Sequence, residues 1–319
     1  MDRSKKYIVS HAPFWHNGSS VTERYYHTMI AALPAVLLGI KQYGIPAVGV
    51  LALSVSSAIF WELAMNLVTR RAVTIADGNA ALIGLLFAMV LPATMPWWAV
   101  LTGTFVAVVI GKQIFGGIGS NAFNPVVLAV AIMTVSWKHL FDFNAALLNY
   151  DLNMEMFYPL AAVKYFGVEA VESFNTAALL MGRQSGGIGA TFGLGLILGG
   201  IYLILRGFIR WEISVSFLFG IFVTAWIFNL VAPDRFTGPV FHLLTGYTLI
   251  GAFFLATEDS SSPVNFIPML IYGVAGGILT VLIRNIGAYI DGVVYAILTI
   301  NLVNPLLDKI RPKPVGKVT

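Results

Sequence analysis

Residues 213–232, ISVSFLFGIFVTAWIFNLVA, form a run of twenty positions without a charged side chain. An α-helix needs about 20 apolar residues to cross the hydrocarbon layer of a membrane. The rest of the chain has the same character, because 58% of its 319 residues are hydrophobic and only 11% are charged. A soluble domain usually carries about 25% charged residues. The sequence therefore predicts an all-α integral membrane protein.

Apolar runs of this kind recur along the whole chain. Their expected cores are residues 28–43, 45–68, 78–94, 97–111, 124–137, 192–206, 213–232, 240–256, 264–283 and 287–305. We therefore expect residues 1–319 to form a single polytopic membrane domain with about ten transmembrane helices.

Basic residues predict the orientation of the chain. With a cytoplasmic N-terminus, 13 of the 19 Lys and Arg residues fall in inside segments and 6 in outside segments. The positive-inside rule then places both termini in the cytoplasm. The expected order is a cytoplasmic segment (1–27), a first helix repeat (28–137), an extracytoplasmic loop (138–191), a second helix repeat (192–305) and a cytoplasmic tail (306–319).

An internal repeat divides the chain into two halves. Leu82–Gly84 aligns with Leu249–Gly251, and Pro96 aligns with Pro263, at an offset of 167 residues. Because five spans separate the two copies, the second copy would cross the membrane in the opposite direction. Many transport proteins have such an inverted five-plus-five repeat, with a site where the halves meet.

The residue types limit the electron carriers that the chain can bind. It has no cysteine, which excludes disulfides and thiolate-bound iron–sulfur clusters from this chain. The five histidines lack metal-ligand spacing, and only His242 lies in an apolar run. The net charge of +4 is small and sorted by topology, so we expect no nucleic-acid partner. If the chain transfers electrons, its carrier must be organic, and we expect no metal site.

The stretch Ser185–Gly193, SGGIGATFG, is the most distinctive in the chain. It surrounds one threonine, Thr191, with glycines at the junction between the outer loop and the sixth span. A hydroxyl there is compatible with a hydrogen bond to a helix carbonyl, with a helix cap, or with acceptance of a phosphoryl group. Helix packing through the GxxxG pairs Gly189–Gly193 and Gly195–Gly199 is the alternative, and spacing alone favours it.

A second glycine-rich stretch, Gly116–Pro125, precedes the fifth span. Asn124 is suited to a helix N-cap, and Pro125 to the first helical position. Alternatively, Asn121 and Asn124 hydrogen-bond the edge of a flat ring that the glycines admit. Both interpretations stay open. Asp291, one repeat later, again precedes a helix, so capping explains part of both segments.

Ionisable side chains inside apolar spans are costly and mark functional sites. Glu62, within WELAMNL, is the one that lies most clearly inside a span. We expect it to face the interior of the bundle, where it is paired or lines a cation route. Unchanged coupled ion transport in a Glu62→Gln variant would refute this role. Charged residues at expected span ends are interpreted as structural; they are Asp77, Lys112, Glu212, Glu258, Asp259 and Arg284.

Four stretches, in order along the chain, resemble the family of Rnf D subunits and B subunits of sodium-pumping NADH:quinone reductases. They are ADGNAALIGLLFAMVLPATMPWW (76–98), GKQIFGGIGSNAFNPVVLA (111–129), SGGIGATFGLG (185–195) and TGYTLIGAFFLATEDSSSP (245–263). Together with the ten-span plan, the resemblance covers nearly the whole chain. The last stretch departs from the family pattern, because Glu258 and Asp259 shift the acidic position and add a carboxylate.

The resemblance implies a flavoprotein. In this family the threonine that closes G-A-T carries FMN through a phosphoester, and here that residue is Thr191. The resemblance also implies a flavin pocket at the second glycine-rich stretch, and it permits a second, noncovalent riboflavin. The expected cofactor-binding residues are Thr191, Ser185, Gly189, Ala190, Asn121, Asn124 and Asp259, and no catalytic residue is expected.

The resemblance further implies a membrane subunit of a redox-driven translocase in the cell inner membrane. The family's complex couples electron flow between ferredoxin and NAD to Na⁺ or H⁺ movement. The implied partners are the G-type flavoprotein subunit, the A-type and E-type membrane subunits, a flavin transferase and membrane lipid. This chain has no nucleotide site of its own. The alternatives are the B-type member of a Na⁺-pumping NADH:quinone reductase, or a flavin-free transporter or channel for a small solute.

Overall fold

The structure, a computed structural model, describes residues 20–144 and 158–311. Residues 1–19 and 312–319, which include most of the expected termini, lie outside the described residues. Within the described ranges the chain is helical and contains no strand, as predicted. Three helices are long and apolar enough to cross a membrane, namely α2 (Ile45–Val68), α10 (Trp211–Val231) and α13 (Phe266–Asn285). These features support an integral membrane protein, whereas the number of ten crossings stays a prediction.

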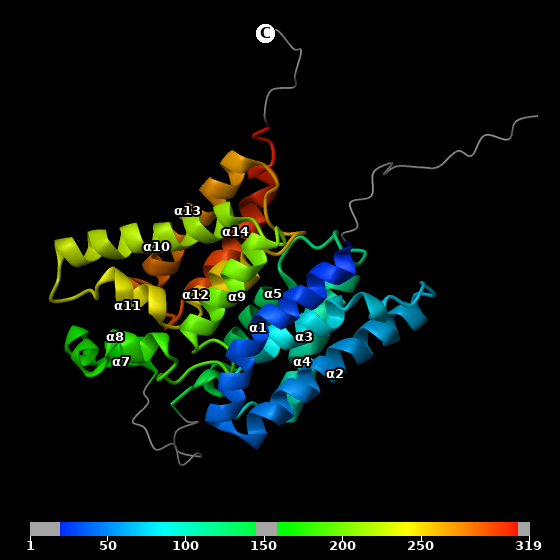
Figure 1. Cartoon of the computed structure of the whole chain (residues 1–319), viewed down its shortest axis with the longest axis horizontal. Helices are drawn as coiled ribbons and strands as arrows, with labels where there is room; N and C mark the ends of the chain where they lie inside the picture. Colours follow the sequence, from blue (N-terminus) through cyan, green and yellow to red (C-terminus); the bar gives the residue numbers. More distant parts are fainter. Residues whose placement is uncertain (1–19, 145–157, 312–319) are drawn as a thin grey trace, which may run out of the picture.

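The first half of the chain forms one group of helices (Figure 1). Its elements are α1 (Val21–Tyr43), α2, the short η1 (Ile75–Asp77), α3 (Asn79–Val90), α4 (Trp97–Phe105), its π-helical continuation η2 (Val106–Gln113), and α5 (Pro125–Ser136). α1 begins before the expected residue 28, because the Ser20 side chain caps it by accepting a hydrogen bond from the amide of Glu23 at 3.0 Å.

The second half repeats this order. Its elements are α9 (Gly193–Leu205), α10, α11 (Pro239–Leu244), α12 (Thr248–Ile250), its π-helical continuation η5 (Gly251–Leu255), α13 and α14 (Val293–Leu307). A shift of 167 residues places α1 over α9, α2 over α10, η1 over α11 and α3 over α12 with η5. It also places α4 with η2 over α13, and α5 over α14. The helix bounds therefore agree with the internal repeat.

The two groups of helices pack against each other through α1 with α9 and α5 with α14. α10 lies along α13 in one group, and α2 lies along α3 and α4 in the other (Figure 1). The α1–α9 contact is close, because a Cβ at Gly199 would lie 2.2 Å from the carbonyl oxygen of Ala31. This contact confirms the packing interpretation of the pair Gly195–Gly199.

The connection between the halves contains short helices in its described parts. They are η3 (Lys138–Phe141), α7 (Pro159–Phe166), η4 (Val168–Ser173) and α8 (Thr176–Leu180), and residues 145–157 lie outside the described residues. The Lys164 side chain on α7 donates to the carbonyl oxygens of Gly287 at 2.7 Å and Tyr289 at 2.5 Å. α7 is thereby held against the end of α13.

Candidate functional site

The stretch Ser185–Gly193 is buried against the C-terminal end of α3. The amide of Gly189 donates to the carbonyl oxygen of Met89 at 2.9 Å. A Cβ at Gly187 would lie 2.6 Å from that same oxygen, and a Cβ at Gly189 would lie 2.5 Å from the Met89 side chain. Only glycine fits at these two positions without a shift of the neighbours.

Thr191 lies two residues before α9 and is only 3% exposed. Its hydroxyl donates to the side-chain oxygen of Gln42 on α1 at 3.3 Å. The N-cap residue of α9 is Phe192, whose side chain has no hydrogen-bond acceptor. The helix-cap alternative for Thr191 is therefore wrong.

A small recess adjoins Thr191. Its walls include Ser185, Ala190, Thr191, Gln184, Tyr158 and Tyr247. Ser185 is itself fixed, because its hydroxyl donates to the carbonyl oxygen of Phe143 at 2.8 Å. Two buried wall atoms have no hydrogen-bond partner among the described residues, the Gln184 side-chain oxygen and the Tyr158 hydroxyl. Because buried polar groups are almost always hydrogen-bonded, these two atoms are available to a bound group.

The structure therefore brings together three of the four residues expected at this site, Thr191, Ser185 and Ala190. Gly189 does not line the recess, because it packs against Met89 on the other side of the stretch. Gly189 therefore serves close packing in this structure, and its expected role in cofactor binding stays a prediction.

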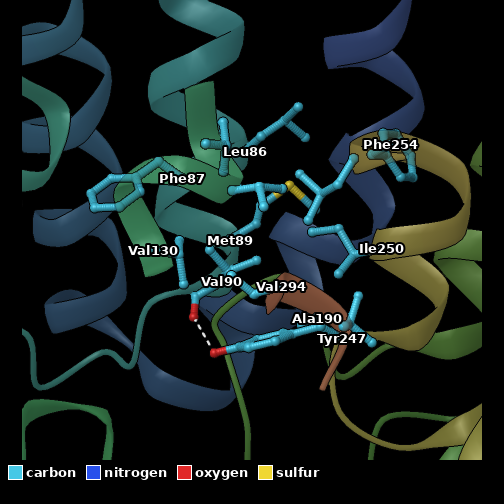
Figure 2. Packing of buried hydrophobic residues seen from close by; sticks show 14 of the residues in the cluster. Leu86, Phe87, Met89, Val90, Val130, Ala190, Tyr247, Ile250, Phe254 and Val294 are labelled. Carbon is cyan, nitrogen blue, oxygen red and sulfur yellow. Dashed lines mark hydrogen bonds between the residues drawn. The ribbon is translucent and has the colours of Figure 1, made fainter. Parts of the chain in front are cut away.

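Tyr247 supplies the wall of the recess from the second half of the chain. Its hydroxyl donates to the carbonyl oxygen of Val90 at 2.8 Å, and Ala190 lies beside its ring (Figure 2). Its amide donates to one carboxylate oxygen of Asp291 at 2.7 Å, and the other oxygen pairs with Arg284 at 3.0 Å. This buried ion pair holds the backbone at the start of α12 in place.

A larger cavity, of about 690 Å³, adjoins the recess. Tyr158 and Tyr247 belong to the walls of both. The remaining walls come from the end of α5, the connection between the halves and the start of α14. Ligand pockets usually measure about 300–1,000 Å³, so this cavity has the size of a small-molecule site.

Asn121, Asn124 and Asp259 line a different cavity, of about 60 Å³. Asn79, at the first position of α3, lines this second cavity. Val90, at the last position of α3, accepts a hydrogen bond from Tyr247, which lines the recess next to Thr191. A helix rises about 1.5 Å per residue, so the two ends of α3 lie about 16 Å apart. The expected flavin-binding residues thus form two separate sites.

The two asparagines have different roles. The Asn124 side-chain oxygen accepts from the amides of Val126 at 2.9 Å and Val127 at 3.1 Å, which confirms the N-cap interpretation. Its amide group donates to the carbonyl oxygen of Leu255 at 2.8 Å. Asn121 instead donates to both carboxylate oxygens of Glu258 at 3.2 Å. A contact of either side chain with a flavin edge stays a prediction.

The two neighbouring carboxylates face different partners. Glu258 accepts from Asn121, while Asp259 pairs with Arg24 of α1. Burial raises the pKa of Asp259 to about 6, against the lowering effect of Arg24 and with a further rise from Glu258. Both carboxylates line this second cavity, and the ion pair of Asp259 with Arg24 joins its wall to α1.

Glu62 faces the bundle interior, as predicted, and it is paired. The Lys112 ammonium lies 2.8 and 2.9 Å from its two oxygens, and the Thr74 hydroxyl donates to one of them at 2.8 Å. Glu62 is 0% exposed and Lys112 is 2% exposed. Lys112, expected at the end of a span, turns inward from the π-helical η2 instead. A cation route at Glu62 stays a prediction.

Sequence reasoning missed three residues around Thr191, namely Gln42, Gln184 and Tyr158. Gln184 directly precedes the glycine-rich stretch, so a wider motif would have included it. Gln42 lies 149 positions away in sequence and carries no local signal. Tyr158 likewise reaches the site only through the folding of the connection.

The chain is similar to known proteins along nearly its whole length. Residues 8–316 match the model of the NQR2, RnfD, RnfE family. The D subunit of the proton-translocating ferredoxin:NAD(+) oxidoreductase complex of Clostridium ljungdahlii is 34% identical, over 95% of this chain and 94% of its own length. The D subunit of the Na(+)-translocating ferredoxin:NAD(+) oxidoreductase complex of Acetobacterium woodii is 33% identical, over 98% and 95%. The D subunit of the ion-translocating oxidoreductase complex of Pectobacterium atrosepticum is 30% identical, over 97% and 98%.

Proposed function

The chain belongs to the NQR2, RnfD, RnfE family, and from this premise we propose that it is the D subunit of an ion-translocating ferredoxin:NAD⁺ oxidoreductase complex. The names of its relatives support this assignment over the quinone-reductase alternative. They include both a proton-translocating and a Na⁺-translocating complex, and one of these two cations is the proposed cargo. The proposed setting is the inner membrane, with ten helices in an inverted five-plus-five repeat and both termini in the cytoplasm.

The proposed redox group is FMN, attached through a phosphoester to Thr191. The recess that Thr191 lines carries this proposal, since its walls include unpartnered polar atoms on Gln184 and Tyr158. The Thr191 hydroxyl itself makes a long hydrogen bond of 3.3 Å to Gln42, and a cavity of ligand size shares two wall residues with the recess. Because Thr191 is 3% exposed, FMN would have to be attached before the chain closes around this residue, or while the region is locally open. A flavin transferase that uses FAD as the FMN donor would carry out the attachment.

FMN would supply one- and two-electron transfer, while the protein sets its position and surroundings. In the described structure, Gly187 lets the backbone approach α3. Gln42 accepts a hydrogen bond from the Thr191 hydroxyl, the proposed attachment oxygen, and Gln184 donates one to the backbone carbonyl of Thr191. The proposed electron donor is the neighbouring G-type flavoprotein subunit, with the A-type and E-type membrane subunits as further partners.

The second cavity does not hold a flavin ring as it stands. Its polar lining is suitable, because the Asn79 side-chain oxygen is buried without a hydrogen-bond partner among the described residues, next to Asn121 and Asn124. Its volume of about 60 Å³ is well below that of a ligand pocket. A noncovalent riboflavin there would require lining side chains such as Arg24 to move.

The test is to replace Thr191 by valine, which keeps the shape of the side chain and removes the hydroxyl. We expect the assembled complex, produced together with its flavin transferase, to lose the flavin fluorescence of this chain in a denaturing gel. The wild-type peptide that contains Thr191 should carry the mass of FMN minus water. Electron transfer from ferredoxin to NAD and the coupled cation uptake should fall with it.

Thr102→Val is the matched control, because the Thr102 hydroxyl donates to the helix carbonyl of Trp98, at 2.8 Å, and lies outside the recess. That variant should keep the adduct. An unmodified wild-type peptide from cells that contain the transferase would refute the flavin proposal and favour a flavin-free transporter. Quinone reduction in place of ferredoxin:NAD activity would favour the quinone-reductase alternative.

A further inference from the structure

We propose that the 690 Å³ cavity, which shares the wall residues Tyr158 and Tyr247 with the Thr191 recess, receives the flavin ring, and that the Tyr158 hydroxyl donates a hydrogen bond to it. This inference rests on the proposed FMN at Thr191 and names the part of the chain that would hold its ring. It concerns the residues of the connection between the halves, which the sequence motifs do not include.

The starting observation is the hydroxyl of Tyr158. The residue is 4% exposed, and its hydroxyl has no hydrogen-bond partner among the described residues. The neighbouring Tyr247, equally buried, has its hydroxyl bonded to Val90. A phenol buried in this way is a donor without an acceptor, and the wall it occupies is shared by the recess and the cavity. Burial also raises the pKa of Tyr158, which keeps the proton on its oxygen.

The walls of the cavity suit a flat aromatic ring. The Phe143 and Tyr158 rings lie 4.9 Å apart between centroids, and the Tyr289 and Tyr295 rings lie 4.1 Å apart. Both pairs line the cavity, together with Tyr247. Aromatic side chains favour stacked and edge-to-face contacts with other rings, so the cavity provides surface for a planar heterocycle.

Tyr158 is also held firmly in place. Its amide donates to the side-chain oxygen of Asn144 at 2.9 Å. The next residue, Pro159, begins α7, whose Lys164 is fixed to the carbonyl oxygens at the end of α13. The hydroxyl is therefore positioned before any ring enters, which lowers the entropy cost of the contact.

The experiment compares Tyr158→Phe with Tyr26→Phe, both in the wild-type complex and in the Thr191→Val background. Tyr26 is 48% exposed and lines neither the recess nor the cavity, so it is a control for the loss of a phenol hydroxyl elsewhere in the chain. Three quantities are measured: the mass of the Thr191 peptide, the thermal unfolding midpoint of the complex, and the midpoint potential of the covalent flavin.

We expect Tyr158→Phe to keep the adduct and to lower the potential, because reduction increases negative charge on the ring and a donor stabilises that charge. A tenfold weaker preference for the reduced ring corresponds to about 30 mV for a two-electron change. Tyr158→Phe should lower the unfolding midpoint only when the flavin is present. In the Thr191→Val background the midpoint should stay or rise, because an unpartnered buried hydroxyl is removed. Tyr26→Phe should change none of these quantities.

A second variant, Ala161→Phe, fills the cavity without removing a polar group, since Ala161 is 3% exposed and lines it. We expect the native complex then to show stronger and less polarised flavin fluorescence, as the ring leaves its aromatic surroundings. If the flavin is attached and neither Tyr158→Phe nor Ala161→Phe changes its potential or fluorescence, the ring lies elsewhere and this inference is wrong. If the wild-type peptide carries no flavin, the proposed function itself fails.

Discussion

Replacement of Lys112 by methionine tests the buried pair that joins η2 to α2. The substitution removes two of the three hydrogen bonds that Glu62 accepts and leaves only the one from Thr74. Glu62 is 0% exposed, so water does not replace the lost partner. Removal of one member of a buried ion pair typically costs about 3–5 kcal/mol. We expect Lys112→Met to lower the free energy of unfolding by about that amount.

The double variant Glu62→Leu with Lys112→Met separates lost attraction from the cost of an unpaired charge. Replacement of both partners by apolar residues of similar volume is often neutral or stabilising. Thr74, which loses its acceptor, is exposed and can bond to water. The double variant should therefore recover most of the stability that the single variant loses.

The assay is reversible unfolding of the purified full-length chain in mixed detergent micelles with increasing SDS, followed by circular dichroism. Lys41→Met is the control, since Lys41 is exposed in the last turn of α1 and should change stability by less than about 0.5 kcal/mol. A loss below about 1 kcal/mol for Lys112→Met, or a double variant as unstable as the single one, would refute the buried-pair reasoning.

Two further predictions follow from individual contacts. The pKa of Asp259 is raised to about 6 in the folded state, against 3.8 ordinarily. Between these two pH values the folded state therefore binds more protons than the unfolded state. The free energy of unfolding should fall as pH rises from about 4 to about 6 and then level off. Asp259→Asn should reduce the change of the unfolding midpoint with pH across that window. An unchanged pH dependence would contradict the assignment to Asp259. Gly187→Ala should cost about 1–3 kcal/mol or more, because its Cβ would lie 2.6 Å from the Met89 carbonyl oxygen. Gly238→Ala, with nothing within 4 Å of its Cβ among the described residues, should leave the same unfolding assay unchanged.

Local features of the chain were sufficient to predict several elements. Asn124 followed by Pro125 predicted the start of α5, and the side chain of Asn124 does cap it. The GxxxG pair Gly195–Gly199 predicted a close helix contact, which α9 makes with α1. The 167-residue offset between repeats is matched by the helix bounds in both halves. Each of these features depends on neighbours in sequence or on periodic spacing.

The partners around the site were not predictable in the same way. Thr191 was identified from its own stretch, but Gln42 and Tyr158 come from segments with no motif. Lys112 was expected at a span end, whereas the π-helical turn directs its side chain inward to Glu62. Asn121 and Asp259 were expected at the site, and both line the second cavity, where they contact different partners.

The amino-acid sequence by itself predicted the membrane environment, the helices and the repeat. Low charge and 58% hydrophobic residues indicate a membrane protein, and in apolar runs of about 20 residues a helix satisfies every backbone hydrogen bond within the segment. The tertiary structure alone decided which side chains meet. It separated the two polar sites by the length of α3, paired Glu62 with Lys112, and brought Tyr158 and Tyr247 from opposite sides of the Thr191 stretch to one wall. The physical reason is that hydropathy and spacing act along the chain, whereas cavities and buried pairs form between segments far apart in it.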